Sequence, residues 1–205
     1  MIRAGIIGGA GYTAGELIRL LVNHPQVRLA FVHSTSNAGN RIADVHGGLE
    51  GDTELRFADT CDLASIDVLL LCSAHGESRK WLEANDVPAG VKIIDLAQDF
   101  RDESDGFVYG LPELNRDRIR TAERVANPGC FATAIQLALL PLAAAGLLTG
   151  EVHVTAVTGS TGAGVKPSAT THFSWRTDNI SVYKAFTHQH LSLIHISEPT
   201  RRVVI

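Results

Sequence analysis

The sequence Gly8-Gly9-Ala10-Gly11-Tyr12-Thr13-Ala14-Gly15 lies between a short apolar run, Ile2 to Ile7, and a segment with helical periodicity, Thr13 to Asn23. The run predicts a buried strand, and apolar residues spaced three and four positions apart in the segment predict a helix. Glycine permits a tight turn and a close approach of the backbone to a ligand, while a helix N-terminus offers free N–H groups to a pyrophosphate. Because this glycine turn joins a strand to a helix, it predicts a dinucleotide-binding site.

The alternation of strand and helix continues beyond this unit. Further strands are predicted at Val27–Val32, Ile66–Cys72 and Val91–Leu96, and a helix is predicted at Glu77–Asn85. The third strand is apolar throughout, as is typical of a parallel strand covered on both faces. Repeated β–α–β units of this kind predict an α/β fold, a Rossmann-type doubly wound parallel sheet.

The pattern loosens after Arg101. The segment Gly106–Asn115 is expected to form loop and turn, followed by a short helix over 116–123. An apolar helix is predicted at Phe131–Ala144, and a strand at Val152–Thr158 precedes a glycine-rich loop, Gly159–Gly164. These elements predict the start of a second, α+β domain.

Composition and charge exclude several classes of protein. Hydrophobic residues make up 45% of the 205 residues and charged residues 20%, which is ordinary for a globular protein. The formal net charge of −4 gives no reason to expect nucleic acid or an anionic membrane as a partner. No apolar run reaches the roughly 18 residues of a membrane span, and no signal peptide is recognisable. The histidines and cysteines lack zinc-ligand spacing, so no metal site and a cytoplasmic location are expected.

The end of the second predicted strand indicates which coenzyme is bound. An NAD-binding fold usually has an acidic residue there to hold the ribose 2′-hydroxyl. This chain has His33-Ser34-Thr35-Ser36-Asn37 instead, with Arg41 a little further on. Hydroxyls and a nearby cation suit a 2′-phosphate, so NADP is favoured over NAD. The alternative is that these residues only cap a turn.

The three cysteines differ in their sequence contexts. Cys130 follows Pro128-Gly129 and opens the apolar helix, where the positive field of a helix N-terminus favours a thiolate. Cys72 ends a buried strand, where a thiol behaves as a small hydrophobic group. Cys61 lies in a polar stretch. Cys130 is therefore the predicted nucleophile, although a packed small residue is the alternative.

Two histidines close the recognisable part of the chain, in Tyr183-Lys184-Ala185-Phe186-Thr187-His188-Gln189-His190. A reaction in which the Cys130 thiol forms a thioester with an acyl group needs a general acid/base for its proton transfers. His190 or His188 is the candidate for that role. A surface pair without a catalytic role is the other interpretation.

Several blocks, taken in order, carry a resemblance to a known family. They are Gly8–Leu17, Ala74-His75-Gly76, Asp95–Arg101, Tyr109–Glu113, Asn127–Cys130, Gly159–Gly164 and His188–His190. Together they resemble the N-acetyl-γ-glutamyl-phosphate reductases, the arginine-biosynthesis family of the semialdehyde dehydrogenase group. The likeness covers roughly residues 1–190.

The resemblance implies an activity and a set of site residues. The activity is NADPH-dependent reduction of N-acetyl-glutamyl 5-phosphate to the 5-semialdehyde with release of phosphate, through a thioacyl intermediate on Cys130 and with His190 as acid/base. The implied coenzyme-binding residues are Gly8, Gly9, Ala10, Gly11, Tyr12, Thr13, Ser34, Thr35, Ser36, Ser73, Ala74, His75, Gly162 and Gly164. The candidate substrate-binding residues are Asn127, Ser160, Lys166, Arg176 and His188.

Alternatives stay open within and outside this group. An aspartate-semialdehyde dehydrogenase and a lysine-pathway relative share most of the machinery, but the blocks at 109–114 and 127–133 favour the arginine family. A nucleotide-binding fragment without turnover is the third hypothesis.

The family pattern also predicts how the chain is divided. Residues 1–130 are expected to form the NADP-binding domain, and 131–190 the start of a truncated catalytic domain. Gln189 replaces an arginine of the family pattern, and Leu191–Ile205 is expected to be an unrelated, disordered tail. A homo-oligomer is expected for the full-length protein, and the activity of this chain alone is in question.

Overall fold

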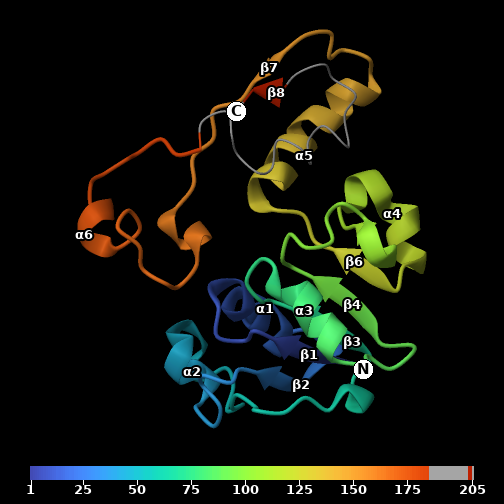
Figure 1. Cartoon of the computed structure of the whole chain (residues 1–205), viewed down its shortest axis with the longest axis vertical. Coiled ribbons are helices and arrows are strands. Elements are labelled where there is room, and N and C mark those ends of the chain that lie inside the picture. The colour runs from blue at the N-terminus through green and yellow to red at the C-terminus, as the bar shows by residue number, and fades with distance from the viewer. Residues whose placement is uncertain (185–202, 205) are drawn as a thin grey trace. The chain divides into compact units, whose positions relative to one another are not determined.

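The computed structural model describes residues 1–184 and 203–204, which are drawn in colour in Figure 1. The chain divides into two compact units, each described here by itself. The first holds Met1–Gly110 and Asp117–Asn127, and the second holds Leu111–Arg116 and the chain from Pro128 onward. The domain boundary expected at residue 130 stays a prediction.

The first unit is built on a six-stranded sheet of order β2-β1-β3-β4-β6-β5, in which every neighbouring pair is parallel. Its strands are β1 (Ile2–Ile7), β2 (Val27–His33), β3 (Val68–Leu71), β4 (Lys92–Asp95), β5 (Val108–Tyr109) and β6 (Arg124–Ala126). The order reverses between β1 and β3, as in doubly wound sheets. The α/β, Rossmann-type fold predicted from the sequence is confirmed.

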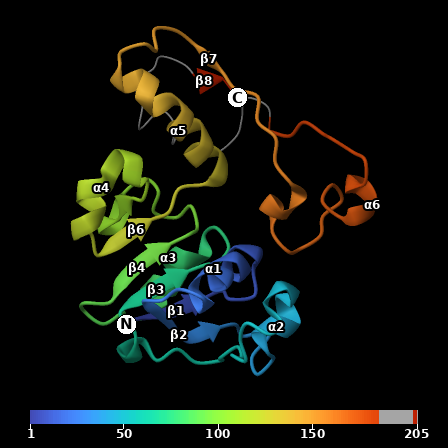
Figure 2. The ribbon, with the colours of Figure 1, turned by 180° about the vertical axis from the view of Figure 1, so that it is seen from behind.

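The two faces of this sheet carry separate hydrophobic cores because successive side chains of a strand point to opposite faces. Ile6 of β1 packs in one core with Ile18 of helix α1 (Tyr12–Val22). Ile7 packs in the other, where helix α3 (Glu77–Ala84) contributes Trp81. Helices α1 and α3 thus cover opposite faces of the sheet. The strands of this sheet lie side by side in Figures 1 and 2.

The edge of the sheet differs from the sequence prediction. The segment 106–115, expected as loop and turn, contains β5, and helix α4 (Pro112–Thr121) begins four residues earlier than the helix expected at 116. Strand β6 was not predicted either. A strand of two or three residues has no periodicity to detect and forms only because its neighbour supplies hydrogen bonds. The helix start did carry a signal, since proline is favoured at the first helical position.

The remaining helices of the first unit are short. They are α2 (Ile42–Val45) and the 3₁₀ helices η1 (Gly47–Leu49), η2 (Leu63–Ser65) and η3 (Ser104–Gly106). Helix α2 and η1 bury Ile42 and Leu49 in the core on the α1 side. They therefore pack on the same face of the sheet as α1.

The second unit contains helix α5 (Cys130–Ala144), η4 (Ser160–Ala163) and α6 (Phe173–Arg176). The strand expected at Val152–Thr158 is much shorter, because β7 covers only Val152–His153. The tail expected from Leu191 lies outside the described residues except for β8 (Val203–Val204), whose backbone pairs in parallel with β7. Among the described residues, no helix is long and apolar enough to cross a membrane.

Candidate functional site

Four of the predicted site segments follow strands at one edge of the sheet. Because the strands are parallel, the residues after β1, β2, β3 and β6 lie at their common carboxyl edge. These residues are Gly8, Ser34, the Cys72-Ser73 pair and Asn127. Open parallel sheets bind ligands at this edge, where the strand order reverses.

The glycine loop that follows β1 packs closely between the ends of the neighbouring strands β2 and β3. Gly8 has a left-handed backbone with φ of 76°, and a Cβ there would lie 2.8 Å from the carbonyl oxygen of Cys72. A Cβ on Gly9 would lie 2.3 Å from Cγ1 of Val32. Both positions exclude a side chain, so the structure brings the predicted glycine loop against the segments that contain Ser34 and Ser73.

Helix α1 begins with an N-terminus that has no side-chain cap among the described residues. Gly11 is the N-cap residue and offers no side chain, and the first turn of the helix contains no acidic residue. The first helical hydrogen bond runs from the Gly15 amide to the Gly11 carbonyl at 3.0 Å. The amides of Tyr12, Thr13 and Ala14 precede it, have no partner in the part of the chain that the structure describes, and can therefore bind an anion.

Helix α3 begins at the same edge, but its N-terminus is already occupied. The amide of Gly76 donates to Oδ1 of Asp99 at 2.7 Å, and the amide of Arg79 donates to Oδ2 of the same carboxylate at 3.1 Å. His75, just before this helix, accepts a hydrogen bond at Nδ1 from the Gln98 amide. An anion at this edge is therefore directed to α1 and not to α3.

The predicted hydroxyl cluster after β2 is present. Ser34 is buried, and its Oγ lies 3.4 Å from Oγ of Ser36, which also accepts a hydrogen bond from Nδ2 of Asn37 at 3.1 Å. Thr35 and Ser36 are exposed. The turn thus presents hydroxyls to solvent beside the glycine loop.

The cation expected near these hydroxyls is engaged elsewhere. The Arg41 guanidinium forms ion pairs with Asp44, Glu50 and Glu54 at 3.4, 3.0 and 3.5 Å. Its hydrogen bond to Glu50, followed by the charges of Glu50 and Glu54, raises the pKa of Arg41. Three carboxylates therefore neutralise this side chain.

A second cation, which sequence reasoning missed, is hydrogen-bonded to the turn after β2. Arg56 donates from Nη1 to the carbonyl oxygen of Gly39 at 2.8 Å, and residues 39–41 pair with 55–57 through backbone hydrogen bonds. Within the described residues no carboxylate pairs with the exposed Arg56 side chain. No sequence signal marks Arg56, because the pairing that places it joins segments 17 residues apart.

Cys130 is the first residue of α5, as predicted, and its side chain is exposed. Gly129 is the N-cap residue, and within residues 1–184 it provides no side-chain cap for the helix. The carbonyl of Gly129 accepts two hydrogen bonds of 2.9 Å, from the amide and the hydroxyl of Thr133. The thiol therefore lies at an open helix N-terminus.

The other two thiols are partly buried. Burial, and secondarily the charge of Asp95, raises the pKa of Cys72 to about 12. Asp95 is itself fully buried, and burial raises the pKa of its carboxyl. Cys61 packs against the core on the α3 side, where burial raises its pKa as well. Neither thiol resembles a nucleophile at neutral pH.

Tyr183 of the second unit lies near Cys130. Burial raises the pKa of the Tyr183 phenol, and the charge of Cys130 raises it further. His188 and His190, the predicted acid/base pair, lie outside the described residues. Their roles stay predictions.

The remaining predicted residues belong to the second unit and are mostly exposed. Ser160 and Gly162 lie in η4, and Gly164 ends it with φ of 91°. Lys166 is exposed, whereas Arg176 donates to the carbonyl of Thr170 at 2.8 Å and to Oγ of Ser181 at 3.0 Å. Among the described residues, no group of three His, Cys, Asp or Glu side chains could hold a metal ion.

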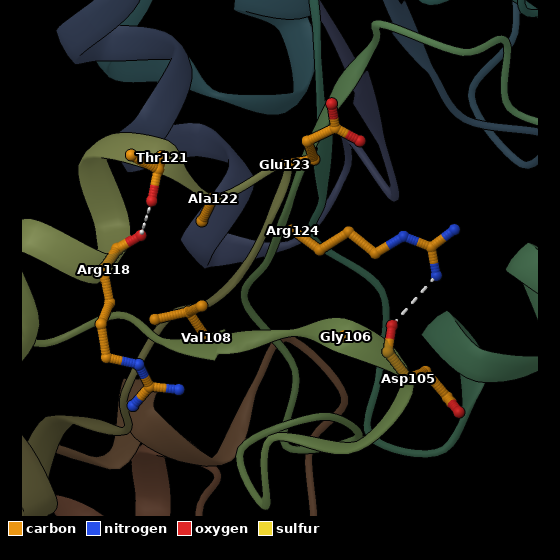
Figure 3. Close-up of a pocket in the computed structure, with 8 residues that line it drawn as sticks. All are labelled: Asp105, Gly106, Val108, Arg118, Thr121, Ala122, Glu123 and Arg124. Carbon is orange, nitrogen blue, oxygen red and sulfur yellow. Dashed lines mark hydrogen bonds between the residues drawn. The ribbon is translucent and has the colours of Figure 1, made fainter.

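A hollow of about 510 Å³ lies at the opposite, amino edge of strands β5 and β6 (Figure 3). Its arginines already have partners: Arg118 pairs with Glu103 at 2.9 Å, and Arg124 donates to the Asp105 carbonyl at 3.3 Å and lies over the Phe107 ring. The hollow contains none of the predicted site residues and lies away from the ligand-binding edge of the sheet.

Two family models match the chain. The semialdehyde dehydrogenase NAD binding domain matches residues 3–122, and the semialdehyde dehydrogenase dimerisation domain matches residues 130–197. Among solved structures, an aspartate semialdehyde dehydrogenase from Candida albicans, determined with NADP, covers 95% of this chain and 58% of its own, with a TM-score of 0.68 and 17% identity. An enzyme of that name from Vibrio cholerae has a TM-score of 0.62, covers 80% of this chain and 48% of its own, and is 23% identical. At these identities the likeness establishes the fold.

Curated relatives are much closer in sequence. A protein named N-acetyl-gamma-glutamyl-phosphate reductase from Bacteroides thetaiotaomicron is 65% identical over 193 residues, which is 93% of this chain and 60% of the relative. A protein of the same name from Azobacteroides pseudotrichonymphae is 63% identical over 206 residues, 98% of this chain and 65% of the relative. The chain thus spans less than two thirds of the length of these relatives.

Proposed function

Because the chain belongs to the semialdehyde dehydrogenase family, we propose that it forms the coenzyme-binding and thiol-bearing part of an N-acetyl-γ-glutamyl-phosphate reductase. The reaction is the NADPH-dependent reduction of N-acetyl-glutamyl 5-phosphate to the 5-semialdehyde with release of phosphate. The name of relatives that are 63% and 65% identical favours this substrate over aspartyl phosphate.

One structural observation carries the proposal. Strand β6 ends at the same sheet edge as the uncapped N-terminus of α1, and the chain continues from β6 through Asn127 to Cys130. Three peptide bonds along the chain separate Asn127, at that edge, from Cys130, the exposed thiol at the start of α5. This combination is what a reduction through a thioester requires.

The residues at the sheet edge fit a dinucleotide. The glycine loop, residues 8–13, would hold the pyrophosphate at the free amides of α1, and Ser73, Ala74 and His75 would line the nicotinamide half. The turn Ser34-Thr35-Ser36 and Arg56 would hold the ribose 2′-phosphate, which favours NADP over NAD. When bound, the reduced nicotinamide supplies a hydride.

The chain's own residues perform the covalent steps. The Cys130 thiolate attacks the acyl carbon, the bond to phosphate breaks, and a thioester forms on Sγ. Addition of a hydride to this thioester would leave a hemithioacetal on Sγ. His190 would accept the proton of the hemithioacetal hydroxyl as the C–S bond breaks, which releases the aldehyde and restores the Cys130 thiolate.

The proposal also covers the residues that would bind the substrate and the domain that contains most of them. Asn127, Ser160, Lys166, Arg176 and His188 would hold the phosphate and the carboxylate, because these anionic groups require cations and hydrogen-bond donors. Gly162 and Gly164 would let the loop approach the coenzyme. We propose 1–130 as the coenzyme domain and 131–190 as part of the catalytic domain, whose match to a dimerisation domain supports a homo-oligomer.

The test is phosphate-dependent reduction of NADP by N-acetyl-glutamate 5-semialdehyde, measured by the absorbance of the reduced nicotinamide. It is done with this chain and with a chain extended to the length of its relatives. Cys130→Ser is the blank, and aspartate semialdehyde is the competing substrate. Faster turnover of aspartate semialdehyde would contradict the proposed substrate. Coenzyme binding without turnover by the extended chain would favour a nucleotide-binding protein.

A further inference from the structure

His46 contacts the glycine loop from a segment 37 residues away. Its Nε2 lies 2.8 Å from the carbonyl oxygen of Gly9. A carbonyl oxygen only accepts hydrogen bonds, so Nε2 must carry the hydrogen. The residue follows helix α2, where its amide donates to Ile42 and its carbonyl accepts from Leu49, both at 2.9 Å. These two backbone hydrogen bonds fix the position of His46, and its imidazole points at the glycine loop.

Gly15, the last glycine of the motif, makes room for this ring. A Cβ at position 15 would lie 2.6 Å from Nδ1 and 2.9 Å from Cε1 of His46. The backbone of Gly15 is helical, so its conformation does not demand glycine. The glycine is required by the imidazole that packs against the first turn of α1.

The hydrogen bond from His46 fixes the direction of a free amide. The chain contains no cis peptide bond among the described residues, so the Gly9 carbonyl and the Ala10 N–H point in opposite directions. The Gly9 amide is anchored too, since it donates to the carbonyl of His33 at 2.9 Å. Within the described part of the chain, the Ala10 amide has no hydrogen-bond partner. With the carbonyl turned to His46, this amide points away from His46.

We propose that His46 is a positioning residue for the coenzyme, which orients the Gly9–Ala10 peptide so that the Ala10 amide donates to the pyrophosphate. The inference rests on the proposed function, because it concerns the same coenzyme site. It adds a residue outside the glycine motif and explains why position 15 is glycine.

The experiment is a double-mutant cycle on the dissociation constant for NADPH, followed by nicotinamide fluorescence well below the melting temperature. His46→Ala should raise that constant about threefold to tenfold, which corresponds to one hydrogen bond. Gly15→Ala should raise it similarly by displacing the ring. The double variant should bind like His46→Ala alone, because without the ring the added methyl displaces nothing. His46→Gln, whose amide can donate to the Gly9 carbonyl, should recover most of the affinity.

A second readout separates positioning from a merely structural role. His46→Ala should weaken NADPH and NADH by the same factor, because both contain the pyrophosphate. Unchanged NADPH affinity in a folded His46→Ala chain would overturn the inference, as would independent, multiplying effects of the two substitutions. Should His46→Ala fail to fold, the dissociation constant of Gly15→Ala for NADPH tests the inference alone, because that variant keeps the histidine. Failure of the wild type to bind either coenzyme would instead overturn the proposed function, and this inference with it.

Discussion

Nε of Arg101 donates a hydrogen bond of 2.9 Å to the carbonyl oxygen of Asn127. The amide of Asn127 donates in turn to the carbonyl of Asp95 at 2.7 Å, so this residue is held from both sides. Arg101 is only 5% exposed and also donates from Nη2 to the Leu96 carbonyl at 3.1 Å. The buried guanidinium thus ties the ends of β4 and β6 together, at the point where the chain leaves for Cys130.

Arg101→Met should destabilise the first unit by about 2–4 kcal/mol, because it leaves two carbonyls without their donors in a buried position. Urea unfolding followed by tryptophan fluorescence measures the change. Arg28→Met is the matched control, since Arg28 is exposed on β2 and makes no side-chain hydrogen bond within the described residues. Equal midpoints for the two variants would contradict the stabilising role of Arg101.

Cys130 should be the thiol that reacts first with iodoacetamide at pH 8, because it is exposed at the start of α5. Cys72, whose pKa is raised to about 12, should react only after unfolding. Peptide mass spectrometry after brief alkylation measures both. Cys130→Ser should abolish the early label, whereas Cys61→Ala and Cys72→Ala should retain it. An early label on Cys72 would show that the thiol at the end of β3 is accessible to the reagent in the folded protein.

Arg56→Gln should reduce the preference for NADPH over NADH, because it removes the cation bound to the turn after β2. We expect roughly a tenfold to hundredfold loss of NADPH affinity, as for a charge-assisted hydrogen bond, with NADH unchanged. Arg41→Gln is the control, since three carboxylates already occupy that guanidinium. Fluorescence titration with each coenzyme measures the affinities. A larger effect from Arg41 would restore it as the 2′-phosphate ligand.

Asp67→Asn should lower the melting temperature at neutral pH but not in strong acid. Arg3 binds the Asp67 carboxylate through side-chain and backbone hydrogen bonds and lowers its pKa from 3.8 to about 2. A depressed pKa in the folded state stabilises the fold above the unfolded-state pKa, and this contribution is lost as the pH falls from about 4 to about 2. Melting curves across this range measure the difference between variant and wild type.

The partner substitution provides the control for this pH dependence. Arg3→Met should reproduce the loss, because the Arg3 guanidinium is the ion-pair partner of the Asp67 carboxylate. Adding Asp67→Asn to Arg3→Met should then change little. A difference between wild type and Asp67→Asn that persists unchanged below pH 2 would rule out the ion pair as its cause.

The amino-acid sequence was sufficient to predict the elements that carry their own periodicity. Strand β1, helix α1 and the glycine loop between them were predicted within a residue or two, because apolar spacing and glycine punctuation are local properties. The same holds for α5, with Cys130 at its start. Strands β5 and β6 were missed, since two or three residues become a strand only beside an existing neighbour.

The parallel sheet, the glycine turn and the candidate nucleophile could be read from the amino-acid sequence alone, because each is encoded in a contiguous pattern. Which groups are available to a ligand depends on contacts that form when the chain folds. Asp99 occupies the N-terminus of α3 from 23 residues away, and that leaves α1 for an anion. Acidic neighbours neutralise Arg41, while backbone pairing brings Arg56 to the turn after β2. Availability depends on what else lies within hydrogen-bond distance, and the folded chain sets those distances between residues that are far apart in sequence.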